Sequence, residues 1–170
     1  MEYRYYEIPA GSPVLALLGD KWVQNYGRDI DYLHFHNHLE VGFCYYGEGT
    51  VTFKEDIPFD GNMFTVIPKN FPHTTTSAGD SVSYWEWLFI DADKFLREVY
   101  KDNPRMAQKV IDRVNKRAHF VRVQDKPQIG ALVQQIIECM RERKEFYLEE
   151  VKGLILAFLL QVARWNREEA

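Results

Sequence analysis

The feature that most constrains the fold is a change in the period of the apolar residues near Asp91. Between Val14 and Ile90 the apolar residues form short runs with strand-like alternation, separated by Gly, Pro, Asn and Asp. These runs are VLALL, KWVQNY, LHFH, EVGFCYY, TVTFKED, MFTVIP and VSYWEWLFI. Strands at such close spacing predict an antiparallel sandwich or barrel. The two glycines of YGEG, residues 46–49, predict a hairpin loop, because glycine supplies the positive φ of tight turns.

After residue 91 the apolar period changes to about three and a half, which predicts helices. Two short helices are expected at residues 91–100 and 104–116, then a strand at 119–123 that the barrel could recruit. A longer helix follows, with one apolar stripe. Asp125, with Pro127 just inside, predicts where this helix begins.

The last helix is apolar around most of its circumference and must therefore be buried on two sides. One side is expected on its own domain and the other on a second subunit, in a homodimer. The alternative is a helix enclosed within one subunit. The residues predicted for the dimer interface are Val151, Leu154, Ile155, Phe158, Leu159 and Val162.

Composition excludes several classes of protein. The chain of 170 residues fits one domain, and its 46% hydrophobic and 27% charged residues are typical of globular proteins. A net charge of -4 gives no attraction for DNA. Cys44 and Cys139 lack CxxC spacing, which predicts reduced thiols in a cytoplasmic protein. The longest apolar run, residues 154–160, is too short to cross a membrane.

A cluster of metal-ligand residue types stands in the stretch HFHNHLE. His34, His36 and Glu40 occupy even positions, so on a strand they share a face, and His73 of PKNFPH could join them in a small barrel. Three imidazoles and a carboxylate can bind Zn, Mn, Fe or Ni, the only cofactor that the sequence suggests. The alternative is a hydrogen-bonded polar cluster at the barrel mouth that contacts an effector directly. His38, beside Asn37, is expected at a bend that faces solvent.

Tryptophans near the end of the strand region predict a binding wall. Trp85, Trp87 and Phe89 share one strand face, whereas Glu86 and Leu88 take the other. An aromatic wall suits a sugar, whose apolar ring face stacks on it, although core packing is the alternative. No P-loop, GxSxG or complete dinucleotide motif is present, and no catalytic residue is predicted. The predicted ligand-binding residues are His34, His36, Glu40, His73, Trp85 and Trp87.

Two motifs resemble those of the cupin superfamily. His34-x-His36-x3-Glu40-x6-Gly47 is similar to the first cupin motif, and Gly61 with Pro68-x-Asn70-x2-His73 is similar to the second. Asn70 replaces the usual glycine and Ser77 the usual asparagine, but neither departure touches the four potential ligands. In cupin enzymes, residues of this kind bind a metal.

A closer resemblance covers nearly the whole chain. The segments EVGFCYYGEGTVTF, VIPKNFPHTTTS and YWEWLFID resemble the N-terminal effector-binding and dimerisation domain of AraC-type transcription regulators. In that family two C-terminal helices form a dimer interface before a DNA-binding region, which this chain lacks. The N-terminal arm, with Tyr3, Tyr5 and Tyr6, resembles the family's arm that folds over bound effector. The alternative for this arm is a frayed terminus or an edge strand.

The resemblance implies a domain organisation and a function. Residues 1–13 are expected to form the arm, 14–90 a cupin-like effector-binding barrel, and 91–170 a helical dimerisation subdomain. The implied protein is not an enzyme but a sensor of a small effector, a sugar or related metabolite, which contacts DNA only through the missing region. The alternative is a small metal-dependent cupin enzyme, a dioxygenase or isomerase, that uses His34, His36, Glu40 and His73. The long helical segment argues against it.

Overall fold

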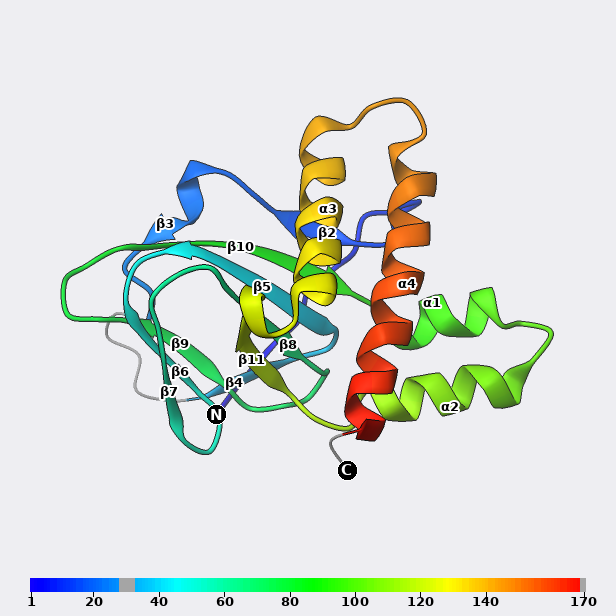
Figure 1. Ribbon diagram of the computed structural model, residues 1–170, viewed down its shortest axis with the longest axis horizontal. Helices are drawn as coiled ribbons and strands as arrows, with labels where there is room; N and C mark the ends of the chain where they lie inside the picture. The colour runs from blue at the N-terminus through cyan, green and yellow to red at the C-terminus, as the bar shows by residue number, and fades with distance from the viewer. Residues whose placement is uncertain (28–32, 169–170) are drawn as a thin grey trace.

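The computed structural model describes residues 1–27 and 33–168. The strands are β1 (Glu2–Arg4), β2 (Leu15–Leu17), β3 (Val23–Gln24), β4 (His34–His36), β5 (Leu39–Tyr46), β6 (Gly49–Thr52), β7 (Asp56–Phe59), β8 (Met63–Ile67), β9 (Thr74–Ser77), β10 (Ser83–Ile90) and β11 (His119–Arg122). The helices are α1 (Ala92–Val99), α2 (Pro104–Val114), α3 (Pro127–Glu142) and α4 (Tyr147–Glu168). Two short 3-10 turns are η1 (Asp20–Trp22) and η2 (Val123–Asp125). Figure 1 shows the strands gathered in one half of the molecule and the helices in the other.

The strands form two layers. The larger sheet has the order β11-β8-β5-β10-β2, with β3 also paired to β10, and all of its pairs are antiparallel. The smaller layer contains β7-β6-β9 and the pair β1-β4. Two backbone hydrogen bonds of 2.8 Å between His34 and His73 join these two parts. The prediction of a cupin-like antiparallel barrel followed by helices is confirmed.

Strand β10 separates two cores. On one face, Trp85, Trp87 and Phe89 belong to the core between the layers. On the other face, Leu88 and Ile90 belong to the larger core under the helices. The predicted division of this strand into two faces is therefore confirmed. Because both faces are covered, the strand is apolar almost throughout.

The predicted hairpin at residues 46–49 is wrong. Strand β5 pairs with β8 and β10, whereas β6 pairs with β7 and β9, so the turn carries the chain from one layer to the other. Gly47 has φ 109°, which favours glycine. A Cβ on Gly49 would lie 2.0 Å from the carbonyl oxygen of Thr76. The second glycine thus allows close contact between backbones rather than a tight hairpin.

The helices begin with different caps. The side chains of Asp91 and Asn103 accept hydrogen bonds from backbone N–H groups in the first turns of α1 and α2. Helix α3 begins at Pro127, as predicted, but Asp125 does not cap it, because Asp125 lies in η2 and Lys126 takes the N-cap position without a side-chain hydrogen bond. Strand β11 pairs with β8, so residues of the helical half complete the larger sheet.

Helix α4 lies between α3 and α2, as Figure 1 shows. Five of the six residues predicted for the dimer interface are fully buried inside the subunit, and Leu154 is half-buried. The five are Val151, Ile155, Phe158, Leu159 and Val162. These five side chains are therefore not available to a partner, as the alternative of a helix enclosed within the subunit implies. The apolar circumference arises because α4 packs against helices on two sides.

Both cysteines are free thiols, as expected, although Cys139 is only half-buried whereas Cys44 is fully buried. No helix within residues 1–27 and 33–168 has the length and apolar character needed to cross a membrane.

Candidate ligand and metal site

The four predicted ligand residues converge from three segments. His34 and His36 are on β4, Glu40 is at the start of β5, and His73 immediately precedes β9. A bend at residues 37–38 turns the chain between β4 and β5. The paired backbones of His34 and His73 bring the third imidazole beside the first two. The candidate metal-binding atoms of all four residues lie within 4.8 Å of one another.

The cluster is buried and closely spaced. Nε2 of His36 lies 3.1 Å from Oε1 of Glu40, and Nε2 of His73 lies 3.3 Å from Oε2. The ring centroids of His34 and His73 are 4.4 Å apart. Nδ1 of His73 is 2.8 Å from the carbonyl oxygen of Phe71, to which it donates. Its Nε2 is therefore unprotonated in the neutral ring and points its lone pair toward the cluster.

Several polar atoms of the cluster make no hydrogen bond within the described residues. They are Nδ1 of His34, both ring nitrogens of His36, Oε2 of Glu40 and Nε2 of His73. The contacts to Glu40 are thus close in distance but do not have hydrogen-bond geometry. Because buried polar groups are normally hydrogen-bonded, this convergence of unpaired nitrogen and oxygen atoms fits a divalent metal. A metal held by these four residues would supply a positive charge that polarises an oxygen of a bound ligand.

The pKa shifts of Glu40 and His34 suit metal binding, whereas that of His73 opposes it, because a ligating imidazole must be neutral. Burial, assisted by nearby His73, lowers the pKa of His34 to about 3. Burial acts to raise the pKa of Glu40, but the neighbouring His73 and His36 outweigh it and hold that pKa well below its usual value. Burial acts to lower the pKa of His73, but the charge of Glu40 outweighs it and raises that pKa. At neutral pH Glu40 is ionised and His34 is neutral, as metal ligands must be.

A cavity of about 340 Å³ lies beside the cluster between the two layers. His34, Glu40 and Trp87 are in its lining, whereas His36 and His73 complete the cluster without lining the cavity. Trp85 is fully buried and stacks on Trp87 with centroids 4.9 Å apart, so it supports the wall and does not line it. Other lining side chains are Arg4, Tyr6, Leu17, Trp22, Gln24, Asn25, Tyr26, Thr74, Thr75 and Phe89.

The N-terminal arm forms one wall of this cavity. Strand β1 pairs in parallel with β4, with Arg4 opposite His36. Tyr6 stacks on Phe89 at 4.0 Å and contacts the edge of His36. The backbone N–H of Tyr6 donates to Asn37, and its carbonyl lies 2.8 Å from Nε2 of His38. The arm is therefore an edge strand, the alternative given for it.

His38 does not face solvent as predicted, because it is half-buried against the arm that it holds. Sequence reasoning also missed Arg4 as a cavity residue. The alternation in the arm contains a signal for it: Arg4 and Tyr6 line the cavity, whereas Tyr3 and Tyr5 are exposed.

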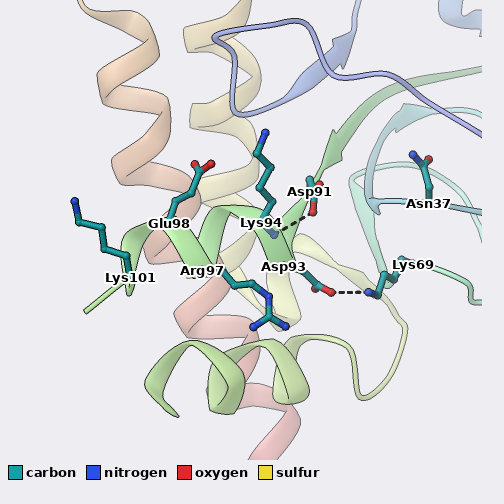
Figure 2. Close-up of a pocket in the computed structure, with 8 residues that line it drawn as sticks. All are labelled: Asn37, Lys69, Asp91, Asp93, Lys94, Arg97, Glu98 and Lys101. Carbon is teal, nitrogen blue, oxygen red and sulfur yellow. Dashed lines mark hydrogen bonds and ion pairs between the residues drawn. The ribbon is translucent and has the colours of Figure 1, made fainter. Parts of the chain in front are cut away.

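A second depression lies outside the barrel, where α1 faces the loop that follows β8 (Figure 2). Its basic side chains are interspersed with acids, and Lys69 forms an ion pair with Asp93. Figure 2 also shows the side chain of Asp91 at the first turn of α1, where it accepts a hydrogen bond from the backbone of Lys94. This mixed, solvent-open surface offers no concentrated charge and no buried donor, so the barrel cavity is the stronger candidate.

No family model matches the chain, and no curated protein is similar to it in sequence. Among solved structures, it is similar to the AraC-like regulator ToxT from Vibrio cholerae. The apo K231A variant of ToxT superposes with a TM-score of 0.57 and 15% identity, over 92% of this chain and 58% of that one. A second ToxT structure, from strain O395, superposes with a TM-score of 0.53 and 15% identity, over 90% of this chain and 54% of that one. The chain shares its fold with part of ToxT, an AraC-like regulator.

The AraC-like transcriptional activator CuxR is also similar, with a TM-score of 0.47 and 13% identity. The match covers 76% of this chain and 42% of that one. This similarity is too low to support a comparison of the two structures. The chain spans about half the length of these regulators. At such identities the likeness to AraC-type regulators concerns the fold. The site must be argued from the residues of this chain.

Proposed function

We propose that this chain is the ligand-sensing and dimerisation domain of an AraC-family transcription regulator and binds a small effector, a sugar or related metabolite, in its barrel. One observation carries the proposal: a cavity of about 340 Å³, with Trp87 in its wall, lies beside four buried side chains in a domain of this fold. The charge of -4 leaves DNA contacts to a region outside residues 1–170. A regulator of this kind acts in the cytoplasm.

The arm connects the barrel cavity to the helices. Arg4 and Tyr6 contribute to the barrel cavity. Residues 5–13 also line an outer cavity of about 810 Å³, together with Phe95 of α1 and Leu156 of α4. An effector that binds one position of the arm more tightly than another would thus change the packing on α1 and α4. Such a shift requires different affinities for the two positions.

Effector binding can be tested with a panel of sugars in thermal unfolding. An effector at a hundred times its Kd should stabilise the fold by about 2.7 kcal/mol. Trp87→Ala should abolish this shift, because Trp87 lines the cavity, whereas Tyr46→Ala should leave it unchanged, because Tyr46 is exposed and does not line the cavity. Equal shifts in both variants would place the effector elsewhere.

A dimer formed through α4 would have to use the outward surface of this helix. Gly153, Leu156, Ala157 and Leu160 have the spacing of one helix face and are exposed or half-buried. Leu160→Glu should convert a dimer to a monomer in sedimentation experiments, with little loss of stability. Phe158→Ala should instead destabilise each subunit by about 3–5 kcal/mol, because Phe158 is fully buried. A dimer that survives Leu160→Glu would exclude this surface.

The unpaired atoms of the cluster favour a second candidate function. A small metal-dependent enzyme, a dioxygenase or isomerase, could hold Zn, Mn, Fe or Ni with His34, His36, Glu40 and His73. Elemental analysis separates the candidates. Stoichiometric iron or manganese that is lost in His73→Ala would favour the enzyme. A metal-free protein that binds a sugar would leave the enzyme without a mechanism.

A further inference from the structure

We infer that the cavity selects an anionic effector, a sugar acid rather than a neutral sugar, and that Arg4 binds its carboxylate. This inference rests on the proposed function, in which a small metabolite occupies the barrel. It adds the charge of the ligand and assigns specificity to a residue of the arm.

The charged side chains that line the cavity differ in how readily they can bind a ligand. Glu40 and Arg4 are the charged residues in this lining, within the part of the chain that the structure describes. The carboxylate of Glu40 lies within the cluster, with Nε2 of His36 and Nε2 of His73 at 3.1 and 3.3 Å from its oxygens. Arg4 has an ion pair with Glu2 at 3.1 Å, but Glu2 does not line the cavity.

The pair of Arg4 and Glu2 can be exchanged for a ligand. Their side chains are 31% and 41% exposed, and pairs in such contact with water contribute little stability. A guanidinium binds a carboxylate through two parallel hydrogen bonds, an arrangement that a neutral hydroxyl cannot match. A divalent ion in the four-residue cluster would add positive charge to the same cavity. With or without such an ion, the Arg4 guanidinium is the group in the described lining that can bind a negative ligand.

The backbone holds Arg4 at the cavity. Strand β1 pairs with β4 so that Arg4 lies opposite His36, and Glu2 N–H donates to the Leu33 carbonyl at 3.1 Å. The guanidinium therefore extends from a paired strand. A preorganised cation of this kind costs less entropy to order than one on a free terminus.

The rest of the lining suits a small polyhydroxylated body. Thr74, Thr75 and Asn25 provide hydroxyl and amide groups, and Trp87 and Phe89 provide apolar faces. The volume of about 340 Å³ is at the small end of the range for ligand pockets, which favours a small metabolite. Aromatic faces, hydroxyl groups and one available cation together match a six-carbon sugar acid.

The test is isothermal titration calorimetry on the whole chain at low salt. The probes are gluconate and glucuronate, with sorbitol and glucose as their neutral counterparts. Both acids should bind at least about tenfold more tightly than their counterparts, because a hydrogen bond to a charged group is the stronger kind. Arg4→Gln should weaken acid binding by about tenfold to a hundredfold. Arg122→Gln is the matched control, since this exposed arginine pairs with Asp60 and does not line the cavity.

Each failure has a distinct meaning. Neutral sugars that bind as tightly as the acids, or acids that bind Arg4→Gln as tightly as the unaltered chain, would overturn the inference and leave the sensing function intact. Absence of binding by all four probes would also overturn it. The sensing function would then depend on the wider sugar panel with Trp87→Ala, a variant that keeps Arg4.

Discussion

Two buried glutamates on neighbouring strands show how differently one sheet uses the same side chain. Glu86 of β10 points toward the helices, where it accepts hydrogen bonds from the Arg141 guanidinium, the Tyr45 hydroxyl and the Gly19 N–H. Glu40 of β5 faces the barrel interior, where its Oε2 has no hydrogen bond within the described residues. The satisfied carboxylate fastens α3 to the sheet. The Glu40 carboxylate, whose Oε2 is unpaired within the described residues, lies in the proposed binding site. Hydrogen bonding thus distinguishes a carboxylate that stabilises the fold from one that is placed to bind a ligand.

The largest expected effect comes from breaking the satisfied cluster. Arg141→Ala leaves the fully buried Glu86 carboxylate without its cation, which should lower the free energy of unfolding by about 3 kcal/mol. This is the low end of the usual range, because Arg141 itself is 36% exposed. Urea denaturation measures the loss. Arg122→Ala, which breaks an exposed pair, should cost less than about 1 kcal/mol, and equal losses would contradict the distinction.

A smaller effect on the free energy of unfolding is expected when the pH is lowered. Burial acts to raise the pKa of Glu86, but its hydrogen bonds from Arg141, Tyr45 and Gly19 outweigh it and lower that pKa to about 2. Since the unfolded value is near 4.5, this contribution is complete above pH 4.5 and is lost as the pH falls toward 2. One proton changes stability by at most about 1.4 kcal/mol per pH unit.

Urea denaturation at several pH values between 4.5 and 2 tests this. Glu86→Gln should show a shallower loss of stability with falling pH than the unaltered chain. The exposed Glu149→Gln serves as the control and should keep the original slope. If Glu86→Gln kept it too, the carboxyl would not titrate as its contacts imply.

The smallest effect on stability is expected at the unsatisfied glutamate. Glu40→Gln keeps the shape of the side chain and removes both the cost of a buried charge and its attraction to the imidazoles, so stability should change by less than about 1 kcal/mol. Affinity for added Zn²⁺ should nevertheless fall by at least about tenfold to a hundredfold, since the loss of even a supporting residue weakens a metal site by that factor. Destabilisation equal to that of Arg141→Ala would make the cluster structural.

The same comparison shows what sequence reasoning could reach. The four cluster residues followed from local spacing, because alternation on a strand and a proline-rich loop restrict where His34, His36, Glu40 and His73 can point. Arg141, in contrast, stands in a run of charged residues, RERK, that carries no local signal of a buried partner. Its partner Glu86 is 55 residues away in the sequence, and no local sequence pattern indicates a contact between residues so far apart.

The other errors have physical causes. Strand β9 was missed because Thr74–Ser77 is polar throughout and lacks an apolar alternation. The turn at residues 46–49 was assigned to a hairpin because glycine indicates where a chain turns but not which strand it pairs with next. The dimer residues of α4 were misplaced because an apolar circumference is the same whether a helix of the subunit or a partner covers it.

The parallel pairing of β1 with β4 has a practical consequence. The strand that presents His34 and His36 has His73 on one side and the first residues of the chain on the other. Proteolytic trimming before Glu7, or a bulky fusion at Met1, would remove or displace one wall of the pocket while the two cores stayed intact. Affinity tags therefore belong at the C-terminus, and preparations should be checked by mass spectrometry before a failed titration is interpreted.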